Sequence, residues 1–226
     1  MVSVTRWSKV YQSLRPLTDK YIRDNVIRGQ YIAGDDRIGY REEKNVRPDS
    51  RTDTYVAMLY CMWITGVRQG VPFYIRTGKQ MPTKVTEIVV HFKPAPMQMF
   101  QMKEGFYKGE ELIIRIQPDE GILQRIAMKE PGAGFYMGTM EMDFSYDQHD
   151  QEMGDAYVRL LEDSLGGWSY YFFTRSDAVD ESWTYFDKIL DYWKKHPETP
   201  LYGYPAGTVG TERSGCIDQP QSFRMD

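Results

Sequence analysis

The chain has 226 residues, a formal net charge of -4 and a pI near 5.5. This acidic balance argues against a nucleic-acid-binding protein, whose surface is usually basic, and no apolar stretch is long enough to cross a membrane. Two cysteines provide neither a disulfide framework nor a metal-ligand spacing. We expect a cytoplasmic protein, because no signal-peptide pattern is present, and a single domain over residues 1–226 with a flexible tail over 213–226.

The first third of the chain predicts a short helix, a strand, a loop and a long strand. Thr18 and Asp19 are good N-cap candidates for a helical turn. Residues 25–31 are typical of extended chain, and the polar residues 33–51 predict a long surface loop. Residues 52–64 are apolar at successive positions, which predicts a central strand covered on both faces.

Residues 71–79 predict a buried strand that stops at Gly78 and then presents Lys79, with Lys84 close behind. Lysine ammonium groups at the end of a strand suit an anionic substrate such as a phosphate. On these residues alone, ordinary solvated lysines are the better interpretation, because most lysines lie at the surface.

The middle of the chain predicts more strands at short spacing, over residues 86–92, 111–117, 122–128 and 140–146. Short spacing favours antiparallel pairing, and the turn at residues 118–121 predicts a hairpin. Arg115 and Gln117 lie on one face of their strand because they are two residues apart. We expect Arg115 to be structural and to hold an acid such as Asp143.

The last third predicts two helices. One begins after Asp155 and ends at Gly166-Gly167. The second begins after Ser176 or Asp177 and has one apolar face, made of Val179, Trp183, Phe186, Leu190 and Trp193. Residues 197–226 are expected to be irregular. Strands followed by helices predict an α+β fold, a large and predominantly antiparallel β-sheet with helices packed on one face.

Several collinear motifs resemble the C-terminal domain of glucose-6-phosphate dehydrogenase, over roughly residues 9–212. In chain order they are Arg28-Gly29-Gln30-Tyr31, Gly39-Tyr40-Arg41-Glu42-Glu43, the stretch from Gly70 to Lys79, the stretch from Arg115 to Gly121, Asp155-Ala156-Tyr157, Arg159-Leu160-Leu161, Arg175-Ser176-Asp177, Trp183 and Tyr204-Pro205-Ala206-Gly207.

The resemblance implies a reaction, a set of ligands and a site. The family transfers a hydride from C1 of glucose 6-phosphate to NADP, or to NAD in some members, and forms the lactone. Lys79 and Lys84 match the two family lysines that help to bind the substrate, and Gln117 matches a position near it. The resemblance also implies a homodimer formed through the sheet.

Other family features are missing from the sequence. We find no glycine-rich phosphate-binding turn after a strand, and no match to the segment with the catalytic histidine. We therefore expect that an N-terminal dinucleotide-binding domain is absent and that the chain alone is inactive. We also expect it to have no catalytic, cofactor-binding or metal-binding residue of its own. NADP would be bound mainly by that absent domain. Val85, Val89 and Gln124 replace basic residues of a second, structural NADP site, and we expect no such tight site here.

Two other functions remain open. One is a non-catalytic assembly or regulatory subunit of the same fold, and the other is a phosphosugar-binding module without a redox role. Lys79, Lys84 and Gln117 favour the enzyme, because a purely structural relative has no physical need for them.

Overall fold

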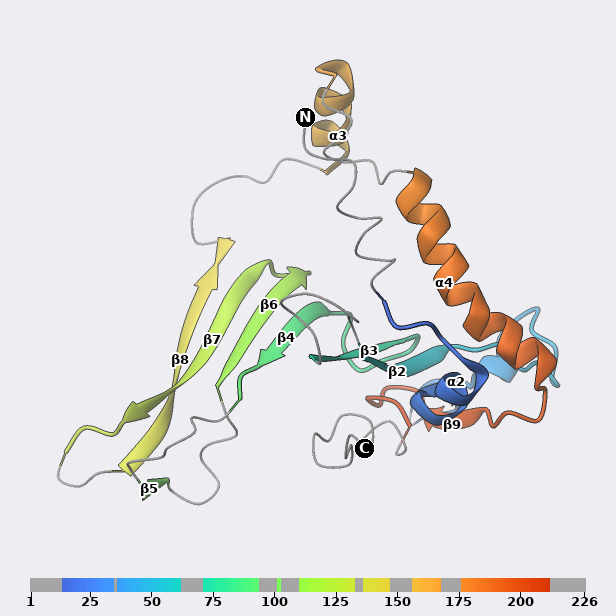
Figure 1. The fold of residues 1–226 in the computed structure, drawn as a ribbon, viewed down its shortest axis with the longest axis horizontal. Helices are drawn as coiled ribbons and strands as arrows, with labels where there is room; N and C mark the ends of the chain where they lie inside the picture. Colours follow the sequence, from blue (N-terminus) through green and yellow to red (C-terminus); the bar gives the residue numbers. More distant parts are fainter. Residues whose placement is uncertain are drawn as a thin grey trace. The chain divides into compact units, whose positions relative to one another are not determined.

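The computed structural model describes residues 14–34, 36–61, 71–93, 101–102, 110–132, 136–146, 156–167 and 176–211. Contacts divide the chain into two compact units, which we describe separately (Figure 1). The first unit comprises Met1–Pro82 and Leu160–Asp226, and the second comprises Thr83–Arg159. The assignment of residues 1–226 to one domain stays a prediction, and the tail expected over 213–226 lies outside the described residues.

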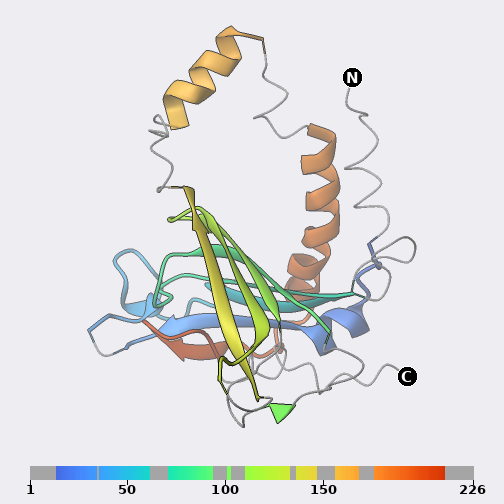
Figure 2. The same cartoon turned by 90° about the vertical axis from the view of Figure 1, so that its left-hand side faces the viewer.

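The first unit contains a four-stranded sheet in the order β3-β2-β1-β9. Its strands are β1 (Val26–Ile32), β2 (Tyr55–Cys61), β3 (Pro72–Gly78) and β9 (Tyr202–Pro205). The pairs β1·β2 and β2·β3 are antiparallel, whereas β9 lies parallel to β1 (Figure 2). The expectation of irregular chain after residue 197 is therefore wrong at β9. Its four residues include a glycine and a proline, and give no alternating pattern that would predict a strand.

Burial confirms one strand prediction in this sheet and overturns another. The strand β2 is central, and its Tyr55, Ala57, Met58 and Leu59 are all buried. The prediction that β3 is buried is wrong, because β3 is an edge strand with residues that are half-buried or exposed. An edge position also explains why a proline is tolerated at the start of β3.

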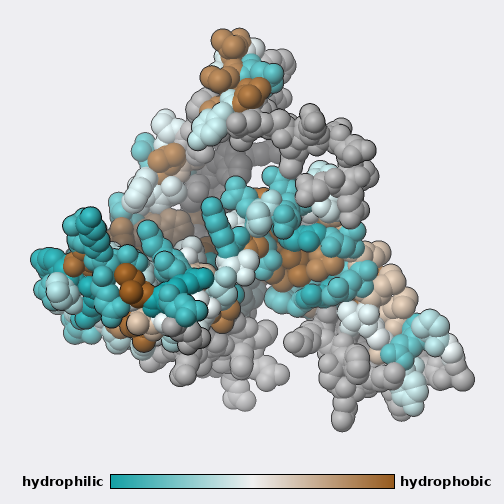
Figure 3. All heavy atoms as spheres, turned by 180° about the vertical axis from the view of Figure 1, so that it is seen from behind, coloured by the Kyte–Doolittle hydropathy of each residue, from teal (hydrophilic) through white to brown (hydrophobic). Residues whose placement is uncertain are grey.

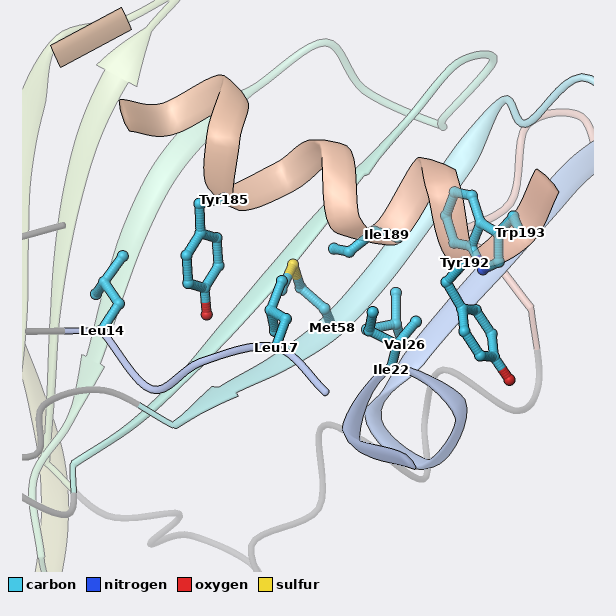
Figure 4. Packing of buried hydrophobic residues seen from close by; sticks show 9 residues of the cluster. All are labelled: Leu14, Leu17, Ile22, Val26, Met58, Tyr185, Ile189, Tyr192 and Trp193. Atoms are coloured by element: carbon cyan, nitrogen blue, oxygen red, sulfur yellow. The ribbon is translucent and has the colours of Figure 1, made fainter. Parts of the chain in front are cut away.

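Helices cover one face of this sheet, as the sequence predicts. The helix α2 (Asp19–Asn25) begins after Thr18, whose side chain accepts a hydrogen bond from the backbone N–H of Tyr21, and this confirms the predicted cap. The helix α4 (Ser176–Lys195) packs across α2, β1 and β2 (Figure 4). The buried cluster between them consists of Leu14, Leu17, Ile22, Val26, Met58, Tyr185, Ile189, Tyr192 and Trp193.

The buried face of α4 differs from the predicted one. Of the five residues predicted to face the core only Trp193 is buried, and the other four are 37–59% exposed. Ala178, Tyr185, Ile189 and Tyr192 are buried instead. Both stripes repeat at helical spacing, so periodicity alone does not choose between them. The buried stripe is rich in tyrosine, and Tyr185 donates a hydrogen bond from its hydroxyl to the carbonyl of Arg15 at 2.9 Å.

A buried arginine links β1 to the end of α4. The Arg28 guanidinium lies 5.3 Å from the ring centroid of Trp193 and donates to the carbonyl of Thr199 at 2.8 Å. It also lies 3.5 Å from the carboxylate of Asp53. Burial lowers the pKa of Arg28 and raises the pKa of Asp53, because both charged forms lose water.

The loop after β1 folds back on that strand through two polar contacts. Tyr31 donates from its hydroxyl to Glu43 at 3.1 Å, and Arg41 donates to the side chain of Gln30 at 2.8 Å. Tyr40, in the short 3₁₀ helix η1 (Tyr40–Glu42), packs edge-on against Tyr31. The first two motifs that resemble the family, residues 28–31 and 39–43, are therefore packed against each other.

The second unit contains a five-stranded sheet in the order β4-β6-β7-β8-β5. The strands are β4 (Thr86–His91), β5 (Gln101–Met102), β6 (Glu111–Gln117), β7 (Gly121–Lys129) and β8 (Tyr136–Ser145). Among the described strands of this unit, β5 and β8 pair in parallel and the other pairs are antiparallel. The predicted β6·β7 hairpin is confirmed, and so are the α+β class and the predominantly antiparallel pairing.

This second sheet has two chemically different faces. Directly opposed residues share a face. The pairing therefore defines an apolar face, interrupted by Gln124, of Ile88, Val90, Leu112, Ile114, Ile122, Ile126, Met140, Met142 and Phe144. The opposite, charged face carries Glu87, His91, Glu111, Arg115, Arg125, Glu141 and Asp143 beside the aliphatic side chains of Val89, Ile113, Leu123 and Ala127. Figure 3 shows hydrophobic atoms gathered along this sheet between hydrophilic ones.

The helix α3 (Ala156–Leu165) occurs where the sequence predicts a helix, and Gly167 follows it with a φ of +75°. Glycine adopts this left-handed conformation at little cost, as a helix C-terminus commonly requires. Across the described ranges, no helix is both long and apolar enough to span a bilayer.

Two neighbouring residues test which face of α4 supports the fold. We predict that Ile189→Ala lowers the free energy of unfolding by about 2–5 kcal/mol, because Ile189 is 5% exposed and its loss leaves a cavity. The matched control Leu190→Ala, at 40% exposure, should cost about 1 kcal/mol or less. Urea denaturation measures both changes, and equal losses would contradict the observed orientation of the helix.

The Tyr31–Glu43 contact predicts a pH dependence. Burial, and then the hydrogen bond to Glu43, raise the pKa of Tyr31 from 10.0 to about 12. Below pH 10 the folded and unfolded states both keep the proton and the stabilisation is complete. As pH rises to about 12 the unfolded state loses the proton first, so the stabilisation is lost. Tyr31→Phe should therefore reduce the fall in stability over this interval by about 1–3 kcal/mol. Denaturant titrations across the interval test this, and identical pH slopes for both proteins would contradict it.

Candidate functional site

The backbone of Lys79 is held by hydrogen bonds on both sides of the residue. Its N–H donates to the carbonyl of Thr54 at 2.8 Å, and its carbonyl accepts a hydrogen bond from the Tyr204 hydroxyl at 2.7 Å. The side chain of Lys79 is exposed. A fixed backbone with an exposed ammonium group presents a positive charge at a defined edge of the first unit.

Tyr204 is at the centre of this arrangement and is 0% exposed. Its hydroxyl also lies 3.2 Å from the carbonyl and 3.2 Å from the side-chain oxygen of Thr54. Thr54 in turn accepts a hydrogen bond on its side-chain oxygen from the N–H of Tyr31 at 3.0 Å. Burial raises the pKa of Tyr204, so its phenol stays protonated and remains a donor.

Gly78 allows the strand to end against Tyr55. A Cβ atom at this position would lie 2.7 Å from the Tyr55 ring, well inside van der Waals contact. The next turn is fixed at Gln80, which has a φ of +51° and whose carbonyl accepts from the N–H of Gly207 at 2.8 Å. Glycine at position 78 thus allows the Tyr55 ring to pack closely against the last residue of the strand.

Lys84 and Gln117 both belong to the second unit. Gln117 pairs with Thr86 at the end of the β4·β6 ladder, where the register shifts, and Lys84 is two residues before Thr86. Both Lys84 and Gln117 are exposed. Lys79 belongs to the other unit, and the boundary between Pro82 and Thr83 lies between the two lysines. The structure therefore groups two of the three predicted residues within one unit.

The predicted ion pair between Arg115 and Asp143 is confirmed. It crosses Gly121 at the start of β7, where a Cβ atom would lie 2.9 Å from the Arg115 guanidinium and 2.4 Å from the carbonyl of Phe144. Glycine at this position lets the arginine reach across a strand. Arg115 has a structural partner, as the sequence predicts, while Gln117 on the same face has no such contact assigned to it.

The histidines in the described part of the chain have acidic neighbours. His91 lies 3.0 Å from Glu111, and His196 lies 2.9 Å from Glu198. His149 is outside the described residues. In the same described part, no three His, Cys, Asp or Glu side chains are close enough to hold a metal ion.

Sequence reasoning missed the role of Tyr204 and Thr54. Tyr204 belongs to one of the motifs that resemble the family, but no local pattern predicts its hydrogen bond to Lys79, 125 residues earlier. A pocket of about 270 Å³ lies elsewhere, between β1, η1 and β9, and none of the three predicted residues lines it.

Comparison with known proteins gives a consistent result. The family model for "Glucose-6-phosphate dehydrogenase, C-terminal domain" matches residues 4–221. The chain is 46% identical over 208 residues to glucose-6-phosphate 1-dehydrogenase from Aggregatibacter actinomycetemcomitans, covering 90% of this chain and 41% of that protein. The enzyme of the same name from Treponema pallidum is 42% identical over 209 residues, with 89% and 40% covered.

Solved structures show the same relationship. A glucose-6-phosphate dehydrogenase in complex with its substrate glucose-6-phosphate superposes with a TM-score of 0.79 and 27% identity, covering 96% of this chain and 44% of that one. Glucose-6-phosphate 1-dehydrogenase from Mycobacterium avium gives a TM-score of 0.69 and 26% identity, with 93% and 41% covered. The chain thus spans about two fifths of the length of these relatives, and it belongs to the family of glucose-6-phosphate dehydrogenase C-terminal domains.

Proposed function

We propose that this chain supplies part of the sugar-phosphate site and the dimer interface of a cytoplasmic glucose-6-phosphate 1-dehydrogenase. The complete enzyme would oxidise glucose 6-phosphate to 6-phosphoglucono-lactone with NADP, in the oxidative pentose phosphate pathway. The observation that carries the proposal is the Lys79 backbone, fixed between Thr54 and Tyr204 while its side chain stays exposed. A substrate-bound relative of the same fold supports it.

The two lysines suit a phosphorylated sugar. A lysine ammonium donates up to three hydrogen bonds and neutralises a phosphate dianion, and a charge-assisted bond is stronger than a neutral one. Only four residues separate Lys79 from Lys84 in the sequence. Gln117, which pairs with Thr86 at the end of the β4·β6 ladder, would bind a sugar hydroxyl through its amide. Together these groups would orient C1 of the sugar toward the nicotinamide.

The described residues do not fit the cofactor. A dinucleotide is usually cradled by a glycine-rich turn between a strand and a helix. In the described part of the first unit the parallel pair β1·β9 has no such turn, and Val85, Val89 and Gln124 provide no positive charge in the second unit. We propose that NADP is bound by protein outside this chain, and that the chain alone does not catalyse the reaction.

The apolar face of the second sheet is the proposed dimer interface. Ile88, Ile122, Met142 and Phe144 on this face are 39–51% exposed in the single chain. A largely apolar face of this kind is unfavourable in water and is typical of a surface that binds another protein. A second copy of the chain would bury it.

The same exposed face is the specific observation that favours the alternative function. A non-catalytic assembly or regulatory subunit of the same fold would need this face but would not need the lysines. Loss of substrate binding on removal of Lys79 or Lys84 separates the two functions.

The first prediction from this proposal concerns the lysines. In the complete enzyme, Lys79→Ala and Lys84→Ala should each raise the Michaelis constant for glucose 6-phosphate about 10- to 100-fold, because each removes a charged hydrogen bond to the substrate. The control Lys195→Ala changes an exposed lysine at the end of α4 and should leave the constant unaltered. Steady-state kinetics measure all three, and an unchanged constant in both site variants would exclude the proposed role.

The second prediction concerns assembly. At micromolar concentration, light scattering should detect a dimer of the wild-type chain, and Met142→Arg on the apolar face should yield monomer. The matched control Val89→Arg adds the same charge to the charged face of the same sheet, at 37% exposure, and should remain dimeric. A monomeric wild type, or dissociation caused only by Val89→Arg, would contradict an interface on the apolar face.

A further inference from the structure

We propose that the Tyr204 hydroxyl is a positioning residue for Lys79, through its hydrogen bond to the Lys79 carbonyl. The inference rests on the proposed role of Lys79 in substrate binding. It assigns a function to a residue that is fully buried and cannot touch the substrate itself.

The hydrogen bonds around Lys79 define what Tyr204 does. The N–H of Lys79 continues the β2·β3 ladder by donating to Thr54, but its carbonyl lies beyond the end of β3 at Gly78. The hydroxyl of Tyr204 is the donor that satisfies this carbonyl, at 2.7 Å. Without this hydroxyl, the Lys79 carbonyl would lose the hydrogen bond that holds it within the described residues. The orientation of the peptide after Lys79 sets the direction in which the Lys79 side chain leaves the backbone.

Tyr204 is itself held in place from three sides. Its ring centroid lies 5.2 Å from that of Tyr55 and 6.4 Å from that of Tyr31. Its strand β9 pairs in register with β1, with Tyr204 opposite Tyr31, and the following N–H of Ala206 donates to the carbonyl of Ile32 at 3.0 Å. A donor fixed this firmly transmits its position to the group that it binds.

The same element also holds the residue after Lys79. The N–H of Gly207 donates to the carbonyl of Gln80 at 2.8 Å, so two consecutive carbonyls after Gly78 accept hydrogen bonds from the segment 204–207. The Tyr204-Pro205-Ala206-Gly207 motif therefore fixes the backbone of the turn that carries Lys79. This gives a structural role to residues 204–207, a motif shared with the family that the proposed chemistry does not otherwise use.

The test uses Tyr204→Phe, which keeps the ring in the core and removes only the hydroxyl. The matched control is Tyr185→Phe, because Tyr185 is also buried and donates from its hydroxyl to a backbone carbonyl, at 2.9 Å, in the helix-covered cluster. Binding of glucose 6-phosphate to the full chain is measured by NMR titration. Hydrogen exchange of the Lys79 and Gln80 amides is measured in the same samples, and thermal unfolding monitors the fold.

We expect Tyr204→Phe to weaken binding of glucose 6-phosphate about five- to tenfold, the effect of losing one hydrogen bond, and to speed amide exchange at Lys79 and Gln80. Tyr185→Phe should change neither substrate binding nor amide exchange at Lys79 and Gln80. It should lower the unfolding temperature about as much as Tyr204→Phe does. In a Lys79→Ala background, adding Tyr204→Phe should cause no further loss of binding, because Tyr204 acts through Lys79.

Three results would overturn the inference: unchanged exchange at Lys79 and Gln80 in Tyr204→Phe, an equal loss of binding in Tyr185→Phe, or additive losses in the double variant. Failure of the proposed function has a different signature. In that case Lys79→Ala alone binds glucose 6-phosphate as the wild type does, and the exchange data then decide by themselves whether Tyr204 holds the Lys79 peptide.

Discussion

The parallel pairing of β9 with β1 is the constraint on which the candidate site depends. It brings a segment from the end of the described chain against the first strand, in the register that places Tyr204 opposite Tyr31. From there the Tyr204 hydroxyl reaches both Thr54 and Lys79. One buried phenol thereby connects β1, the loop before β2 and the turn after β3. An ordinary phenol is protonated at neutral pH, and burial raises the pKa of Tyr204 further, so the connection persists there.

The two units differ in how the faces of their sheets are covered. The first has a conventional core, in which α2 and α4 cover one face of the sheet and a tyrosine-rich cluster fills the other. The second is a sheet whose charged face is neutralised internally: Arg125 binds both Glu111 and Glu141, and Arg115 binds Asp143. Its other face remains apolar and exposed in the single chain. This asymmetry is expected of a sheet that completes its burial by binding another surface.

Much of this architecture could be predicted from local pattern. The cap at Thr18, the bounds of β6 and the β6·β7 hairpin follow from side-chain capping, alternation and turn composition. The Arg115–Asp143 pair could also be predicted, because a cation on an alternating strand needs an acid on the same face. These features are encoded over a few residues, where sequence spacing determines position.

The features that could not be predicted depend on long-range contacts. Apolar composition suggested that β3 is buried, but burial depends on whether a strand has one neighbour or two. Helical period did not reveal that Ile189 and not Leu190 faces the core, since both positions fit an apolar stripe. Lys79 and Lys84 were identified by resemblance to a family, and no local rule could reveal that Tyr204 anchors the first of them.

The central claim is that Lys79, held by its backbone, binds the phosphorylated sugar. A crystal structure of the full-length protein with glucose 6-phosphate bound tests it most directly. The account predicts the Lys79 ammonium within about 3 Å of a substrate oxygen, with the Tyr204 hydroxyl still bonded to the Lys79 carbonyl. Substrate bound elsewhere, with the Lys79 side chain in solvent, would contradict the account.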